Sequence, residues 1–165
     1  MDGPFGSLWA AILEGSSQFE PSLIKAWGCA AWSHFCREAY DVIRILLADG
    51  QELVGQVTRQ MLDRQPDLEV VSVVSDGPAL MKAVARDMPD VALVDISLPG
   101  GGGLAVTAQI CALSPNTVVM LMTGYDEDVC AKAAIETGGC GCVLKDVRGG
   151  ELVRAVRQAV ALTPS

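Results

Sequence analysis

Short apolar runs alternate with amphipathic segments through the last three-quarters of the chain, and this alternation limits the fold more than any other feature. Five short runs, mostly aliphatic, have the length and composition of buried parallel strands. They cover residues 42–48, 68–74, 90–95, 117–122 and 140–144. Apolar residues at helical spacing follow each run, over residues 52–64, 77–88, 104–113, 126–136 and 148–162. Strict alternation predicts an α/β fold, a doubly wound five-stranded parallel sheet covered by helices on both faces.

The beginning of the chain does not follow this pattern. It contains all three tryptophans, and apolar spacing predicts helices over residues 5–14 and 21–39. We therefore divide the chain into an N-terminal helical extension of residues 1–41, a domain of residues 42–162 and a tail of residues 163–165. This extension could pack against the domain or mediate a homodimer.

Composition excludes several classes of function. The chain has 165 residues, half of them hydrophobic but only 5% aromatic, so the core must be aliphatic. Twenty acidic residues against twelve basic ones give a net charge of −8. This disfavours nucleic acid as a partner, because phosphate binding needs clustered Lys and Arg. The apolar run 8–13 is too short to span a bilayer, and the N-terminus lacks the positive charge of a secretory signal. We expect no membrane span and a cytoplasmic protein.

The cysteines are even in number but irregularly spaced, and no export signal accompanies them. A disulfide framework is therefore not expected, and each cysteine is interpreted as a small buried hydrophobe or a bystander. Cys140 and Cys142 are two residues apart and would share one face of a buried strand, which argues against an exposed redox pair. A zinc site would need an unusual ligand set, because His34 is the single histidine. The cysteines are Cys29, Cys36, Cys111, Cys130, Cys140 and Cys142.

Polar residues with compatible chemistry stand at four of the five predicted strand ends. They are Asp49, Asp95, Thr123 and Lys145. Ligands of open parallel sheets bind at the carboxyl ends of the strands, so these side chains should converge. Two carboxylates, a hydroxyl and an ammonium suit a divalent cation together with a phosphoryl group. Each residue alone is more often a cap or turn residue, and it is the combination that predicts a site.

Four sequence stretches carry a family resemblance. They are IRILLADG, PDVALVDISLPG, VVMLMTGYDED and GCGCVLKD, and they begin at residues 43, 89, 118 and 139. With these stretches, residues 42–162 resemble the CheY-like receiver domain of two-component response regulators, which has a (βα)5 flavodoxin-like fold. The last stretch and the run ELVRAVRQAV after it most resemble the class whose receiver precedes a LuxR-type helix-turn-helix. No such effector follows here, so we do not expect this chain alone to bind DNA.

The resemblance implies a role for each strand-end residue. Asp95 would accept a phosphoryl group from a histidine kinase, and a downstream protein would read the change. Asp49, Asp95 and the backbone carbonyl of Ser97 would hold Mg²⁺, while Thr123 and Lys145 would bind the phosphoryl group. The chain would not be an enzyme, beyond self-phosphorylation and autodephosphorylation. Pro99 and Gly103 would shape the loop after the third strand.

Two positions depart from the family pattern. Gly50 stands where the family has a second acid, which should weaken magnesium binding because one carboxylate ligand is lost. Cys142 stands at the aromatic switch position, three residues before Lys145, so a coupled threonine–aromatic switch cannot work in its usual form. Two alternatives therefore stay open: a degenerate receiver that binds proteins independently of phosphorylation, or the receiver part of a LuxR-type regulator.

Overall fold

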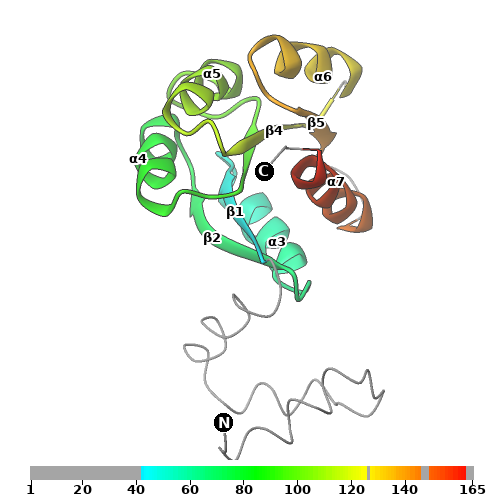
Figure 1. The fold of residues 1–165 in the computed structure, drawn as a ribbon. Helices are drawn as coiled ribbons and strands as arrows, with labels where there is room; N and C mark the ends of the chain where they lie inside the picture. The colour runs from blue at the N-terminus through cyan, green and yellow to red at the C-terminus, as the bar shows by residue number, and fades with distance from the viewer. Residues whose placement is uncertain (1–41, 126, 146–148, 163–165) are drawn as a thin grey trace, which may run out of the picture. The chain divides into compact units, whose positions relative to one another are not determined.

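The computed structural model describes residues 42–125, 127–145 and 149–162. The helices predicted over residues 5–14 and 21–39 lie outside the described residues. Within them, strands and helices alternate strictly, as predicted (Figure 1). The strands are β1 Ile43–Ala48, β2 Leu68–Val74, β3 Val91–Asp95, β4 Val118–Thr123 and β5 Gly141–Leu144. The helices are α3 Glu52–Leu62, α4 Gly77–Asp87, α5 Gly103–Leu113, α6 Glu127–Glu136 and α7 Gly149–Ala161.

The five strands form one parallel sheet with the order β2-β1-β3-β4-β5. The chain winds from β1 outward to β2, and then crosses back to β3 on the other side of β1. This reversal places the topological switch point between β1 and β3, where ligands bind in such sheets. The predicted doubly wound α/β fold is confirmed.

Both faces of the sheet are buried. One hydrophobic cluster joins the sheet to α3 and α7, and a second joins it to α4, α5 and α6 (Figure 1). Consecutive residues of β1 divide between them, since Ile45 and Leu47 belong to the first cluster and Leu46 and Ala48 to the second. The buried hydrophobic side chains of the described residues are aliphatic, Met or Cys, as the composition predicted.

Helix α3 turns a different side toward the sheet from the one that the spacing of its apolar residues predicts. Leu53 and Val57 are 75% and 57% exposed, while Gly55, Thr58 and Leu62 face the sheet. Gly55 lies on this inward side, where a Cβ would be in ordinary van der Waals contact with Val73 Cγ1, at 3.4 Å. The sequence pattern of α7 is confirmed, with Leu152, Val153, Val156 and Ala159 buried.

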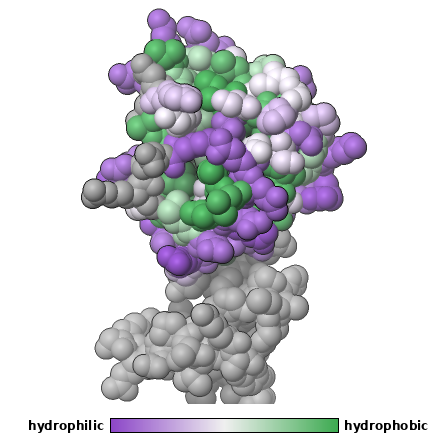
Figure 2. All heavy atoms as spheres, turned by 180° about the vertical axis from the view of Figure 1, so that it is seen from behind, coloured by the Kyte–Doolittle hydropathy of each residue, from purple (hydrophilic) through white to green (hydrophobic). Residues whose placement is uncertain are grey.

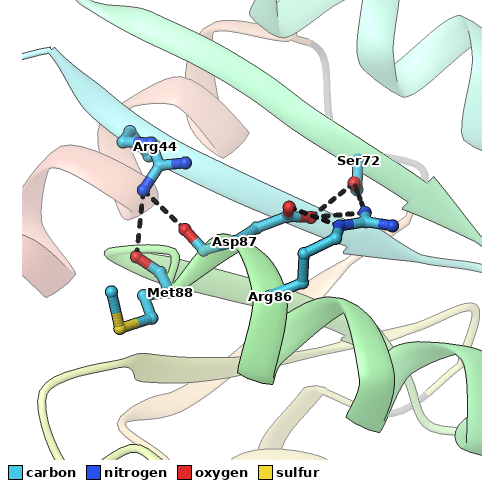
Figure 3. Close-up of polar contacts among 5 residues, drawn as sticks. All are labelled: Arg44, Ser72, Arg86, Asp87 and Met88. Atoms are coloured by element: carbon cyan, nitrogen blue, oxygen red, sulfur yellow. Dashed lines mark hydrogen bonds and ion pairs between the residues drawn. The ribbon is translucent and has the colours of Figure 1, made fainter.

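A polar network ties the end of α4 to β1 and β2 (Figure 3). Arg44 Nη1 donates to the carbonyl oxygens of Asp87 and Met88, at 2.6 and 3.2 Å. The Asp87 carboxylate accepts hydrogen bonds from Arg86 Nε and Ser72 Oγ, both at 2.7 Å. These donors lower the pKa of Asp87 to about 2, with Arg86 the larger cause. The network thus fixes α4 on the sheet.

None of the described helices is both long enough and apolar enough to cross a membrane. On the face of the molecule in Figure 2, hydrophilic side chains surround smaller hydrophobic groups.

Candidate functional site

Three of the predicted residues are in direct contact at the carboxyl edge of the sheet. Asp49 follows β1 and Asp95 ends β3, and the pairing of Ala48 with Val94 makes them neighbours. Lys145 follows β5, and its Nζ lies 2.9 Å from Asp49 Oδ2 and 2.9 Å from Asp95 Oδ2. The two aspartates are 2% and 4% exposed. The ammonium group therefore bridges two buried carboxylates.

The charge of Lys145 is secured by this arrangement. Burial acts to lower the pKa of Lys145, because it disfavours the charged amine. The contacts with Asp95 and Asp49 outweigh that effect and raise the pKa above the usual lysine value. Lys145 is accordingly a fixed positive charge at the site at any physiological pH.

Backbone amides orient both carboxylates. The amide of Gln51 donates to Asp49 Oδ1 at 2.8 Å, and the amide of Ser97 donates to Asp95 Oδ1 at 2.9 Å. Each is a contact from an Asp to the backbone two residues later, the usual geometry of an Asx turn. The second oxygen of each aspartate is left to face Lys145. Asp49 Oδ2 is buried and accepts no well-aligned hydrogen bond, so its contact with Lys145 is an ion pair.

Thr123 lies at the same edge, at the end of β4. It is 3% exposed, and its position follows the pairing of Met122 with Asp95. Its hydroxyl accepts a hydrogen bond from the Tyr125 amide at 3.3 Å, and its carbonyl accepts one from the Lys145 amide at 2.7 Å. The backbone positions of Thr123 and Lys145 are therefore coupled directly.

The loop after β1 packs against the loop after β3. A Cβ on Gly50 would lie 2.7 Å from Pro99 Cδ, closer than such atoms approach, so glycine permits the present loop geometry. Sequence reasoning interpreted Gly50 as a missing ligand and missed this packing role. At the first residue of α5, a Cβ on Gly103 would collide with the carbonyl oxygen of Asp95, so glycine lets the helix begin this close to the site.

The groups at the site that could coordinate a metal ion all offer oxygen atoms. Asp49 Oδ2, the Asp95 carboxylate and the Ser97 carbonyl are of the type that hard cations such as Mg²⁺ prefer, and waters commonly complete the shell of that ion. Among the described residues, no three His, Cys, Asp or Glu side chains form a group that could hold a metal. The chemistry of these oxygens suits Mg²⁺, and two of the three groups that offer them are carboxylates.

The interpretation of the cysteines was wrong in two respects. Cys130 of α6 and Cys142 of β5 form a disulfide, with their Cα atoms 5.7 Å apart. The tight turn between helix and strand, in which Gly138 has a φ of 92°, brings the inward face of α6 opposite β5. Cys140 precedes β5 and is exposed, so it does not share a buried strand face with Cys142. Cys111 is also free, and the remaining two cysteines lie outside the described residues.

Comparison with known proteins identifies the family. The family model for the response regulator receiver domain matches residues 45–157. The chain is 33% identical over 119 residues to the uncharacterized transcriptional regulatory protein YxjL of Bacillus subtilis, covering 72% of this chain and 55% of that protein. It is 32% identical over 120 residues to the DNA-binding transcriptional activator DevR/DosR of Mycobacterium tuberculosis, covering 73% and 55%. The chain thus spans about half the length of these relatives.

Solved structures agree. The signal receiver domain of the putative response regulator NarL from Mycobacterium tuberculosis has a TM-score of 0.70 and 28% identity, covering 74% of this chain and 99% of that one. A LuxR-family DNA-binding response regulator from Staphylococcus aureus has a TM-score of 0.67 and 25% identity, covering 72% and 99%. Together with the strand order and the family match, these likenesses show that the chain belongs to the response regulator receiver domain family of two-component signalling, as the sequence motifs indicated.

Proposed function

We propose that this receiver accepts a phosphoryl group on Asp95 from a histidine kinase. The observation that carries the proposal is the Lys145 ammonium held against both Asp49 and Asp95. A carboxylate oxygen of Asp95 attacks the phosphorus of the donor phosphohistidine. The P–N bond breaks, its electron pair leaves with the imidazole, and the product on Asp95 is an acyl phosphate. Lys145 and the Thr123 hydroxyl face the negative oxygens of the transferred group.

Magnesium is the cofactor that this chemistry needs. Asp49, Asp95 and the Ser97 carbonyl would hold the ion, which would supply positive charge against the incoming phosphoryl oxygens. With glycine at position 50, we expect a lower affinity than in a receiver that has a third carboxylate.

The response to phosphorylation spreads from the ends of β4 and β5. Because the Lys145 amide donates to the Thr123 carbonyl, a shift of either residue toward the phosphoryl group displaces the other. Helix α6 lies between these two strands in sequence and packs on both. We propose that a downstream protein reads the changed surface there. The chemistry of the chain itself is limited to self-phosphorylation and autodephosphorylation. Since histidine kinases use cytoplasmic ATP, the proposal places the receiver in the cytoplasm.

Mass spectrometry of the intact protein tests the proposal. Wild type incubated with acetyl phosphate and Mg²⁺ should gain one phosphoryl group, and Asp95→Asn should gain none because an amide cannot form the acyl phosphate. Asp128→Asn, which changes an exposed acid on α6, is the matched control and should behave as wild type. Phosphate uptake by Asp95→Asn at the wild-type rate would assign the acceptor elsewhere.

A second candidate function is a protein-binding module that does not depend on phosphorylation. Gly50 favours it, because glycine removes one carboxylate from the magnesium site. Wild type that gains no phosphate from acetyl phosphate or from a phosphorylated kinase, even in high Mg²⁺, would support this function over the first.

A further inference from the structure

We propose that the disulfide between Cys130 and Cys142 is a redox-controlled lock on the response of this receiver, opened by a dithiol reductant. The proposal rests on the proposed function, because it concerns how a phosphorylated site reaches the surface of α6. In the oxidised protein the bond holds α6 on β5. In the reduced protein the helix is free to move when Asp95 is phosphorylated.

The disulfide joins two elements that the response must separate or rearrange. Cys142 lies in β5, three residues before Lys145, and pairs with Leu121 of β4. Two pairs further along the same ladder, Thr123 faces Leu144. The covalent bond therefore joins the strand immediately before Lys145 to the helix that follows Thr123 in the chain.

Apolar packing alone holds α6 weakly. Among the described side chains of α6, Cys130 and Ala134, one turn apart, are the buried ones, at 2% and 0% exposure. Two of its large apolar residues, Val129 and Ile135, are 68% and 65% exposed. The free energy of apolar burial scales with the area removed from water, and Ala and Cys bury little. The disulfide is thus the strongest single attachment of α6 to the sheet.

Helix α7 shows the contrast on the other face of the sheet. It buries Leu152, Val153 and Val156, none more than 5% exposed, in the cluster that also contains Val143 of β5. Helix α7 shares a hydrophobic cluster with Val143, whereas α6 is attached to β5 by a bond that thiols can break. Reduction should consequently release α6 and leave α7 in place.

The chemistry of opening is thiol–disulfide exchange. Cys142 is partly exposed while Cys130 is buried, so a thiolate of the reductant attacks Cys142 Sγ. The S–S bond breaks, and Cys130 leaves as a thiolate that takes up a proton. The second thiol of the reductant then attacks the mixed disulfide and releases Cys142 as a thiol. The protein gains two electrons and two protons, and the dithiol becomes a cyclic disulfide.

The two free cysteines of the described residues do not substitute for the reductant. Burial raises the pKa of the Cys111 thiol and that of the Cys140 thiol, although Cys140 as a residue is exposed. Since the thiolate is the attacking species, a raised pKa slows exchange at neutral pH. Disulfides of cytosolic proteins are mostly transient or redox-sensing, which fits a receiver that works in the cytoplasm.

Amide hydrogen exchange of α6 tests the lock without phosphorylation. Wild type is compared before and after reduction by dithiothreitol, with the oxidation state of Cys130 and Cys142 established by alkylation and peptide mapping. Reduction should speed exchange in residues 127–136 at least tenfold and leave 149–161 within twofold. Cys142→Ala should exchange as reduced wild type with or without dithiothreitol. Cys140→Ala, the matched control, should keep the full response to reduction. Equal exchange of α6 in both oxidation states would overturn the proposal.

A second measurement connects the lock to signalling. Oxidised and reduced wild type are treated with acetyl phosphate and Mg²⁺, and both phosphate uptake and exchange in α6 are followed. Equal uptake with a change in α6 only in the reduced form is the expected result. Uptake with the same change in both forms would refute the lock alone, whereas no uptake in either form would refute phosphorylation alone. A bond that stays intact in a reducing glutathione buffer would be structural and would also overturn the proposal.

Discussion

Replacing Lys145 by methionine should destabilise the domain in a way that magnesium reverses. The variant keeps much of the apolar stem of the lysine but removes the ammonium that lies between Asp49 and Asp95. Two contacts of 2.9 Å to one nitrogen place the two Oδ2 atoms no more than 5.8 Å apart. At an effective dielectric constant of about 20, two unit negative charges at that separation repel by about 3 kcal/mol. Removing one partner of a buried ion pair commonly costs about 3–5 kcal/mol, so the two estimates agree.

The assay is urea denaturation of the full chain at neutral pH, with the disulfide kept oxidised. In the absence of divalent cations, Lys145→Met should lower the free energy of unfolding by about 3 kcal/mol. The matched control is Lys82→Met on the exposed face of α4, which should stay within about 0.5 kcal/mol of wild type. Magnesium should then stabilise Lys145→Met more than wild type, because no ammonium competes for the carboxylates. Equal stability of the two lysine variants without magnesium would refute the bridging role of Lys145.

Three further predictions concern other parts of the molecule. Gly50→Asp should lower the free energy of unfolding by about 1–3 kcal/mol without magnesium, because the new Cβ meets Pro99. Thermal melts with and without Mg²⁺ should show a larger stabilisation by magnesium than in wild type. An equal stabilisation would mean that position 50 does not face the metal. Reducing the disulfide, whose cysteines are 12 residues apart in sequence, should lower the free energy of unfolding by about 3 kcal/mol, as denaturation with and without dithiothreitol would show. Because the pKa of Asp87 is lowered to about 2, its carboxylate should make wild type more stable than Asp87→Asn above about pH 4. This difference in the free energy of unfolding should disappear as the pH falls through 2. A difference that persists below that pH would contradict the role of the carboxylate.

The sequence predicted what depends on local pattern. Hydrophobic runs and helical spacing placed five strands and five helices. The rule that parallel strands end at one edge predicted that Asp49 and Asp95 lie close together. Lys145 was placed at the same edge, but its reach across β4 to both carboxylates depends on side-chain length and on the pairing of β4 with β5.

What the sequence did not predict depends on contacts between distant segments. Helix α3 turns Gly55 and Thr58 to the sheet and leaves Leu53 and Val57 exposed, which its apolar periodicity does not predict. The disulfide requires the inward face of α6 to meet one residue of β5. The spacing of twelve residues between Cys130 and Cys142 does not predict a bond unless the turn between helix and strand is known. The contact of Gly50 with Pro99 joins two loops that are far apart in sequence. The family sequence pattern therefore indicated a missing acid at position 50 but not the packing that requires glycine there.

The two edges of the sheet have consequences for self-association. Edge strands invite pairing with strands of other molecules when they are long and flat, because their backbone groups are unpaired on one side. Strand β5 has only four residues, which gives a second strand few groups to bind. Strand β2 has seven, but its pairing with β1 is interrupted after Val70, so that Val71 is an extra residue and the strand is not flat. The short length of β5 and the bulge in β2 thus each oppose the pairing of an edge strand with another molecule. The domain should therefore resist aggregation through its edges even at high protein concentration.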